Sequence, residues 1–271
     1  LSAWLANAAR DPVAAERVTS LHRRTLPAVV EEPMAPDVPE GGDDWQSDLI
    51  FKANGHELKV SYANACMILR HAPEWSRRFA WNDMASAPVI FDHVGDRTFR
   101  TVTDADVARA RESIEMKWKI DPGPEKMWSA VTVVAQERKF HPVRDVLKGL
   151  TWDGTPRIDR VATDILRSTD AQAPLMLRRW FVSLAARVLN PGCKVDTALV
   201  FVGAQGARKS SFFDVIAGRY FCDSHADITS KDIYLQLAES WVFELAEIDG
   251  VTTRRHADEI KAFLSSRNDR F

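Results

Sequence analysis

The chain has 271 residues, 45% hydrophobic and 27% charged, which is the balance of a soluble globular protein with room for two domains. This composition excludes disorder over the whole chain. The formal net charge of -2 excludes a global basic field, so a nucleic acid would have to meet a local patch of positive charge.

The cysteines and the N-terminal residues bear on the compartment. Cys66, Cys193 and Cys222 are far apart and form no C-x-x-C pair, which argues against a zinc site and is typical of a reducing environment. The first residues, LSAWLANAARDPVAAERV, carry charges early and contain no long apolar run, so they resemble neither a secretory signal nor a membrane span. We therefore expect a cytoplasmic protein that does not associate with membranes.

Residues 1–44 form the first predicted segment. Residues 4–25 repeat apolar side chains every three or four positions, which predicts a short pair of amphipathic helices. Residues 26–44 gather proline, glycine and acid without periodicity and indicate a flexible linker. We place the first domain boundary after this linker.

Residues 45–160 predict a small, largely helical module of mixed α/β character. Two short strand-like runs flank an Asn-Gly turn, and a strand-like APVIFD follows a first helical stretch. Thr103 is the expected N-cap of a long helix, because Asp104 and Asp106 suit the first turn of that helix. Two more helical stretches complete a unit that is compatible with a winged-helix-like fold.

Residues 161–271 alternate helix and strand signals. Residues 161–190 predict one helix. TALVFVG, residues 197–203, is a continuous apolar run that predicts a strand buried in a parallel sheet. SSFFDVIAGRYF then predicts a helix and SWVFELAEIDG a second buried strand. Strand, glycine loop, helix and strand follow in the order of an α/β nucleotide-binding fold.

The loop GAQGARKSS, residues 203–211, fits the phosphate-binding pattern G-x-x-x-x-G-K-[ST] at Gly203, Lys209 and Ser210. Glycines let the chain wrap closely around phosphates, N–H groups at a helix N-terminus bind their oxygens, and the lysine reaches the outer phosphates. The serine hydroxyl would bind Mg²⁺. This interpretation predicts a helix that starts near Arg208. The alternative is a plain strand-to-helix connection in which Lys-Ser is accidental.

Arg208 stands where the pattern has its second glycine. Glycine permits either sign of φ, whereas arginine is unstrained only at negative φ, which is natural if this residue begins the helix. The side chain would then lie outward in solvent or add a cation to a nucleotide or nucleic-acid strand. The sequence does not separate these two roles.

A hydrophobic strand that ends in acid is what an NTPase needs beside its phosphate loop, with one carboxylate for Mg²⁺ and another to orient the attacking water. Glu244, Glu247 and Asp249 are the candidates. Glu244 is expected within the strand, where an unpaired charge is costly, so a metal or Lys209 is its expected neighbour. The alternative is an edge strand with outward acids.

Basic side chains cluster between residues 138 and 160, where they could contact phosphates. Interleaved acids favour a solvated surface of mixed charge instead. The basic residues are Arg138, Lys139, Arg144, Lys148, Arg157 and Arg160.

Three stretches together, VFVGAQGARKSSFF, WVFELAEIDG and ADEIKAFLSSRNDRF, resemble the virulence-associated E family of P-loop ATPases of phages and mobile elements, relatives of superfamily-three helicases. The resemblance runs from about residue 44 to the end. It implies an α/β P-loop NTPase core of the AAA+ or helicase-like kind over residues 161–271, preceded by the module of residues 45–160. In this family the place of Arg208 is not reliably glycine.

The resemblance implies an ATP- and Mg²⁺-dependent DNA helicase or helicase-like motor. Such a motor would form a homo-oligomeric ring on single-stranded or forked DNA and work beside a primase. Lys209, Glu244 and Glu247 would be catalytic, and Ser210 and Glu244 would hold the metal. The implied nucleotide-binding residues are Gly203, Ala204, Gln205, Gly206, Ala207, Arg208, Lys209, Ser210 and Ser211. Further possible site residues are Asp249, Lys261 and Arg270.

A ring-forming motor needs further strands with a polar sensor and an arginine finger, and this sequence stops at Phe271. We therefore expect a core truncated at its C-terminus, either as a fragment or as a truncated product. Two other functions stay open. One is a nucleotide-binding regulator or phage-interference protein without motor activity. The other is a metabolic P-loop kinase, for which the sequence shows no acceptor site and no lid of arginines.

Overall fold

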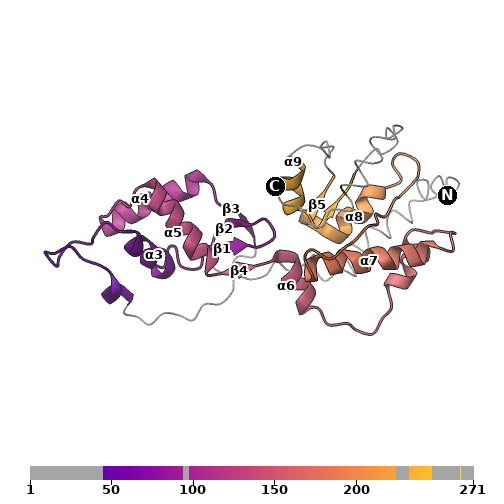
Figure 1. Cartoon of the computed structure of the whole chain (residues 1–271), viewed down its shortest axis with the longest axis horizontal. Coiled ribbons are helices and arrows are strands. Elements are labelled where there is room, and N and C mark those ends of the chain that lie inside the picture. The colour runs from indigo at the N-terminus through magenta and orange to yellow at the C-terminus, as the bar shows by residue number, and fades with distance from the viewer. Residues whose placement is uncertain (1–44, 94–97, 224–231, 246–262, 264–271) are drawn as a thin grey trace. The chain divides into compact units, whose positions relative to one another are not determined.

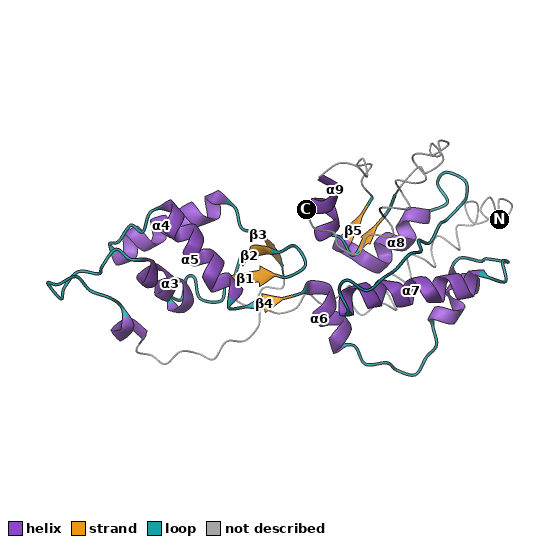
Figure 2. Ribbon diagram, in the orientation of Figure 1, coloured by secondary structure: helices purple, strands orange, loops and turns teal. Residues whose placement is uncertain are grey.

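The computed structural model describes residues 45–93, 98–223, 232–245 and 263 (Figure 1). The predicted N-terminal helices and linker lie outside this part of the chain. The fold is mixed α/β and rich in helix, with short strands (Figure 2). Contacts divide the described chain into two units, with the division between residues 146 and 147. Among the described residues, no helix has the length and apolar character that crossing a membrane requires.

The first unit, residues 45–146, packs three helices with a four-stranded sheet. The strand order is β3-β2-β1-β4, antiparallel except for the pair β1 and β4, and α5 contacts α3, α4, β1 and β2. The elements are η1 (Trp45–Asp48), α3 (Tyr62–His71), β1 (Phe79–Asn82), β2 (Ala87–Phe91), β3 (Phe99–Thr101), α4 (Asp104–Trp118), α5 (Pro124–Gln136), β4 (Lys139–Phe140) and α6 (Pro142–Gly149), which crosses the division.

Local sequence signals are confirmed in most of this unit. Helix α4 begins directly after the predicted N-cap Thr103, and the strand-like APVIFD forms β2. The two strand-like runs around the Asn-Gly turn do not form full strands. They are joined by a single antiparallel bridge between Phe51 and Leu58. Apolar side chains of α3, α4 and α5 share one core, which includes Ile68, Leu69, Ile114, Met127 and Val131.

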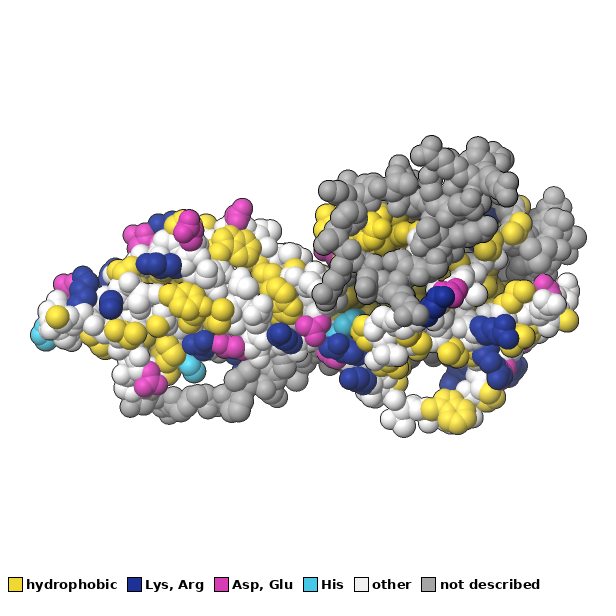
Figure 3. Space-filling model, viewed as in Figure 1, with side chains coloured by type: hydrophobic (Ala, Val, Ile, Leu, Met, Phe, Trp, Pro, Cys, Tyr) yellow, Lys and Arg dark blue, Asp and Glu magenta, His cyan; other side chains and the backbone are white. Residues whose placement is uncertain are grey.

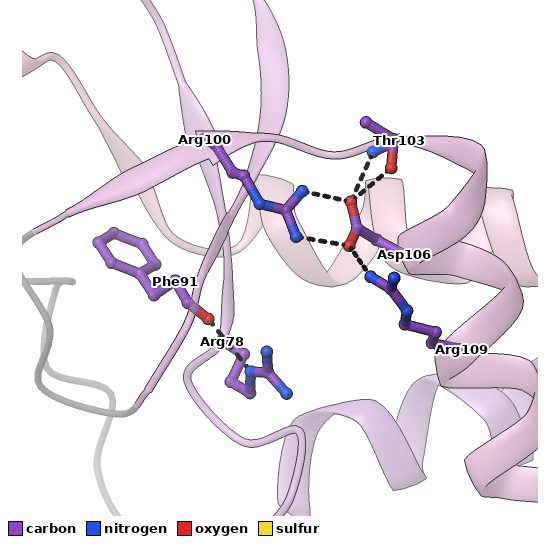
Figure 4. A network of polar contacts seen from close by, with 6 residues as sticks. All are labelled: Arg78, Phe91, Arg100, Thr103, Asp106 and Arg109. Carbon is purple, nitrogen blue, oxygen red and sulfur yellow. Dashed lines mark hydrogen bonds and ion pairs between the residues drawn. The ribbon is translucent and has the colours of Figure 1, made fainter.

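Asp106 fixes the start of α4 against β3 (Figure 4). Its carboxylate is only 3% exposed and accepts two hydrogen bonds from the Arg100 guanidinium, at 2.5 and 2.7 Å. It also accepts from the backbone N–H and the hydroxyl of Thr103, at 2.9 and 2.7 Å, and lies 3.5 Å from the guanidinium of Arg109. One buried carboxylate therefore joins a helix cap to two arginines.

Asp106→Asn is expected to lower the free energy of unfolding by about 2 kcal/mol near neutral pH, because it removes the buried negative charge that accepts hydrogen bonds from Arg100 and Thr103. The loss is limited because Arg100 is partly exposed and can bond to water instead. Arg100 and then Thr103 hold the pKa of Asp106 well below its usual range. This stabilisation is complete above the unfolded-state pKa of about 4 and is lost as pH falls towards the folded-state pKa. Urea denaturation between about pH 6 and about pH 2 measures the effect.

The difference in stability between wild type and Asp106→Asn should narrow as the pH falls. Glu112→Gln, at an exposed position of the same helix, is the matched control and should change stability little at any pH. A difference that stays constant across this pH range would contradict the role of the Asp106 charge.

The described part of the second unit begins at residue 147, and the two strands described there, β5 and β6, pair in parallel. Phe213, Ala217 and Val242 form a buried cluster against which Trp180, Leu199 and Phe201 pack. The elements are η2 (Ile158–Arg160), the π-helical η3 (Val161–Ile165), α7 (Ala173–Leu189), α8 (Lys209–Ala217), η4 (Gly218–Tyr220), β5 (Phe221–Cys222), α9 (Asp232–Ala238) and β6 (Val242–Phe243).

The single helix predicted over residues 161–190 is wrong, because the chain breaks between η3 and α7. Arg167 has a left-handed φ of 54°. The hydroxyl of Ser168 accepts from the N–H of Asp170, and the carboxylate of Asp170 accepts from the N–H of Gln172. Such local side-chain bonds to the backbone compete with helix formation, and the helical spacing of the apolar residues did not reveal them.

The strand predicted over residues 197–203 is also absent. Leu199 and Phe201 face the core, whereas Val200 and Val202 are each 63% exposed, so the alternation of a strand is kept. No described residue forms a ladder with this segment, and an extended segment without a neighbour is not a strand. The expected burial within a parallel sheet is therefore wrong as well, because every second apolar side chain of this segment is exposed.

Candidate nucleotide site

The glycine loop joins the extended residues 197–203 to helix α8. Residues 205 and 206 form a turn in which Gly206 has a φ of 80°, and α8 begins at Lys209, as the loop pattern predicted. The first N–H groups of a helix have no partner within the helix and carry a partial positive charge. The loop therefore ends at a helix N-terminus that suits an anion.

Arg208 departs from the expected conformation. It is the N-cap of α8 and has φ 57° and ψ 33°, which is left-handed, so the expectation of negative φ is wrong. The loop reverses its backbone here before it enters the helix. A left-handed conformation costs a residue with a side chain about 1–2 kcal/mol, which explains why the general pattern places glycine at this position.

Arg208→Gly is expected to raise the free energy of unfolding by about 0.5–1 kcal/mol, since the relief of left-handed strain exceeds the added entropy of the unfolded chain. Arg208→Ala is the matched control, because it removes the exposed side chain but keeps the strain. Thermal denaturation of the three proteins compares them. A glycine variant less stable than the alanine variant would show that position 208 is not left-handed in solution.

Lys209 folds back over the loop. Its ammonium group donates to the carbonyl oxygens of Gly203, at 2.8 Å, and Ala204, at 3.1 Å. The lysine thus lies beside the loop backbone that the pattern assigns to phosphates. Both of its hydrogen-bond partners among the described residues are neutral carbonyls, so its charge neutralises no described carboxylate.

Ser210 and Glu244 are brought together from two elements. The Ser210 hydroxyl, in the first turn of α8, donates to Glu244 Oε1 at 2.8 Å. Glu244 follows β6 instead of lying within it, which corrects the expected placement, and its N–H donates to the carbonyl of Cys222 on β5 at 2.8 Å. The second oxygen, Oε2, is buried and has no hydrogen-bond partner.

The buried Oε2 atom is the feature of this site that calls for a ligand. An unpaired carboxylate oxygen away from water is costly unless a cation or donor reaches it. A hydroxyl and a carboxylate are both oxygen ligands of the kind that Mg²⁺ uses, together with water and nucleotide phosphates. Ser210 and Glu244 therefore fit the metal that the sequence pattern implies. Elsewhere in the described residues, His, Cys, Asp and Glu side chains form no group of three that could hold a metal.

The remaining predicted residues divide into two sets. Ala204, Gln205 and Gly206 are exposed in the loop, and Ser211 follows Ser210 in α8. Glu247, Asp249, Lys261 and Arg270 lie outside the described residues. The sequence did not single out Cys222, whose carbonyl fixes the backbone of Glu244; the two-residue β5 gave no distinct signal.

Of the six basic residues between 138 and 160, three form ion pairs with acids of the described chain: Arg144, Arg157 and Arg160. Arg144 bonds to Asp83 at 3.0 Å. Arg157 and Arg160 pair with carboxylates four residues away, at 2.6 and 2.7 Å. Charges of both signs are interspersed over the visible face of the first unit (Figure 3). These pairs support the interpretation of a mixed-charge surface; Arg138, which is buried, does not fit it.

Comparison with known families gives one match, in the second unit. Residues 147–271 match the family model of the virulence-associated protein E-like domain. No curated protein matches the chain. The match covers the loop, α8 and Glu244, and it indicates a protein associated with phages or mobile elements. Residues 147–271, slightly less than half of the chain, are thus similar to the virulence-associated protein E-like domain.

Proposed function

We propose that this domain binds ATP with Mg²⁺ and hydrolyses it, as the ATPase of a DNA helicase or helicase-like motor of a phage or mobile element. The observation that carries the proposal is the contact between Ser210 and Glu244, 2.8 Å, directly beside Lys209 at the start of a helix. A plain connection between an extended segment and a helix would not explain why a carboxylate that accepts from a hydroxyl keeps its other oxygen buried and unpaired, because that arrangement costs free energy.

Each residue has a defined task in this proposal. The N–H groups at the start of α8 and the ammonium of Lys209 bind phosphate oxygens, which requires Lys209 to leave the carbonyls of Gly203 and Ala204. Ser210 and Glu244 hold the metal through their oxygens. When bound, Mg²⁺ supplies charge neutralisation on the outer phosphates. Glu247 is assigned to orient the attacking water, as the family resemblance implies.

The test is ATP hydrolysis by the full chain with Mg²⁺, in the presence and absence of single-stranded DNA. We expect DNA to stimulate hydrolysis and Lys209→Ala to abolish it. Lys194→Ala is the matched control, because this exposed lysine does not belong to the loop pattern and pairs with Asp196. Sedimentation with nucleotide and forked DNA tests the proposed homo-oligomeric ring, and co-purification with a primase activity tests that partner.

Three outcomes separate the alternatives. ATP binding without hydrolysis would replace the motor by a nucleotide-binding regulator. Phosphate transfer to a small molecule, independent of DNA, would indicate a kinase. Hydrolysis that survives Lys209→Ala would refute the assignment of the site.

A further inference from the structure

Arg138 in the first unit is a buried arginine whose position is fixed by its backbone. Only 6% of the surface of Arg138 is exposed. Its N–H donates to the carbonyl of Ala135 at the end of α5, at 2.9 Å, and its carbonyl accepts from the N–H of Trp81 on β1, at 3.0 Å. The turn between α5 and β4 therefore holds this residue against the sheet.

The guanidinium of Arg138 has no hydrogen bond or ion pair within the described part of the chain. The three other polar or charged residues that are buried as whole residues in the described part of the chain have hydrogen-bond partners. Asn64 bonds to the backbone of residues 50 and 59, Asn82 accepts from Met84, and Asp106 pairs with arginine. The fully buried polar atoms without a partner in the described residues include no nitrogen of Arg138, so its guanidinium keeps some exposure to solvent. A buried cation without a partner is costly unless an anion compensates it.

The charges nearest to Arg138 do not provide that anion. Arg77 adds a second positive charge. The carboxylate of Glu137 is already engaged by Arg70, which bonds to it through two nitrogens at 2.6 and 3.0 Å. Burial, and then the charge of Arg77, lower the pKa of Arg138. The exposed Lys139 follows directly in the chain. The acid whose charge acts on Arg138, Glu137, is therefore already bound to another arginine.

We propose that Arg138 binds a phosphate group, with Arg77 adding positive potential. A guanidinium presents a planar fork of donors that matches a phosphate, and a phosphate group can compensate more than one positive charge. The group comes from a nucleic-acid strand or from a free phosphate compound, which share this chemistry. The site lies in the first unit and does not depend on the nucleotide site of residues 203–211.

The first experiment titrates inorganic phosphate against chloride at equal ionic strength and follows thermal unfolding of the full chain. It is done in the Lys209→Ala background without Mg²⁺, so that the glycine loop does not contribute. Phosphate should raise the melting temperature of this parent and of Lys139→Gln, which removes one exposed charge next to the site. Arg138→Gln should lose that rise, and Arg138→Lys should keep part of it.

Chloride alone gives an independent check. Arg138→Gln should melt at a higher temperature than its parent there, because an uncompensated buried charge is removed. If Arg138→Gln instead melts lower in chloride, or if it fails to fold while Arg138→Lys folds without any response to phosphate, the arginine has a structural role and the proposal is overturned.

The second experiment distinguishes the source of the phosphate. Binding of a fluorescent thymidine oligonucleotide is measured by anisotropy over a range of salt concentrations. If the phosphate belongs to a nucleic-acid strand, Arg138→Gln should reduce the slope of log affinity against log salt by about 0.7. The same reduction should be seen whether or not the protein also carries Lys209→Ala. A response to inorganic phosphate without an effect on the oligonucleotide assigns the site to a free phosphate compound. Absence of both effects refutes it.

Discussion

Lys209→Ala is expected to lower the rate of ATP hydrolysis by at least about 100-fold, because a preorganised cation that meets developing charge on the phosphates contributes roughly 3–4 kcal/mol. Lys209 is the cation that the described loop places beside its own backbone, 2.8 Å from the Gly203 carbonyl. Steady-state phosphate release at saturating ATP measures the effect, and titration with a fluorescent ATP analogue separates binding from catalysis.

The fold should survive this change. Lys209 bonds to two neutral loop carbonyls that water can satisfy once the side chain is removed, so we expect the free energy of unfolding to change by less than about 1 kcal/mol. Lys194→Ala should match wild type in both assays. A Lys209→Ala protein that melts normally and hydrolyses ATP normally would mean that another cation serves the phosphates.

Helix starts were the features best predicted from the sequence, because their signals are local. Thr103 and Asp106 lie three residues apart and satisfy one another at the start of α4. Lys209 opens α8 for the same kind of reason, since the glycine loop and the apolar spacing after it specify a turn and then a helix. In both cases the residues that decide the structure are neighbours in the chain.

Features that depend on distant residues were not predicted. The segment of residues 197–203 has the side-chain pattern of a strand, but pairing requires another segment at its edge. Arg138 looked like one member of a basic surface, and its burial follows from the way the α5–β4 turn meets β1. Composition and spacing carry no information on such contacts.

The candidate site lies between these cases. The family resemblance implied that Ser210 and Glu244 would hold one metal, and the structure places their oxygens 2.8 Å apart across 34 positions. It did not predict that Lys209 would bond to the loop, or that Arg208 would be left-handed. A family pattern fixes which residues meet, whereas their conformation before a ligand binds depends on the loop itself.

Glu244→Gln is expected to change stability and activity in opposite directions. Without ligand, the free energy of unfolding should rise by about 1 kcal/mol, because the substitution replaces a carboxylate whose buried Oε2 atom is unpaired by a neutral amide. The amide oxygen can still accept from Ser210. Hydrolysis of ATP should fall by about 100-fold or more, because the metal loses its anionic ligand.

Thermal unfolding with and without Mg²⁺ and ATP measures both effects. Wild type should be stabilised by the pair, whereas Glu244→Gln should start higher and respond little. Glu239→Gln, which changes an exposed glutamate of the same unit, is the matched control and should behave as wild type. Ser210→Ala should shift the unliganded protein the other way, by about 1–2 kcal/mol, because it leaves both oxygens of Glu244 unpaired.

The combination of signs is what separates a metal site from a structural contact. If Glu244 only tied α8 to the end of β6, both Glu244→Gln and Ser210→Ala would destabilise the protein, and Mg²⁺ with ATP would stabilise the variants as much as wild type. A stabilising Glu244→Gln change without loss of the Mg²⁺ response would place the metal on other oxygens. An unpaired buried carboxylate destabilises the unliganded protein, and a bound cation can offset that destabilisation. The free energies of unfolding of Glu244→Gln and Ser210→Ala measure how large it is.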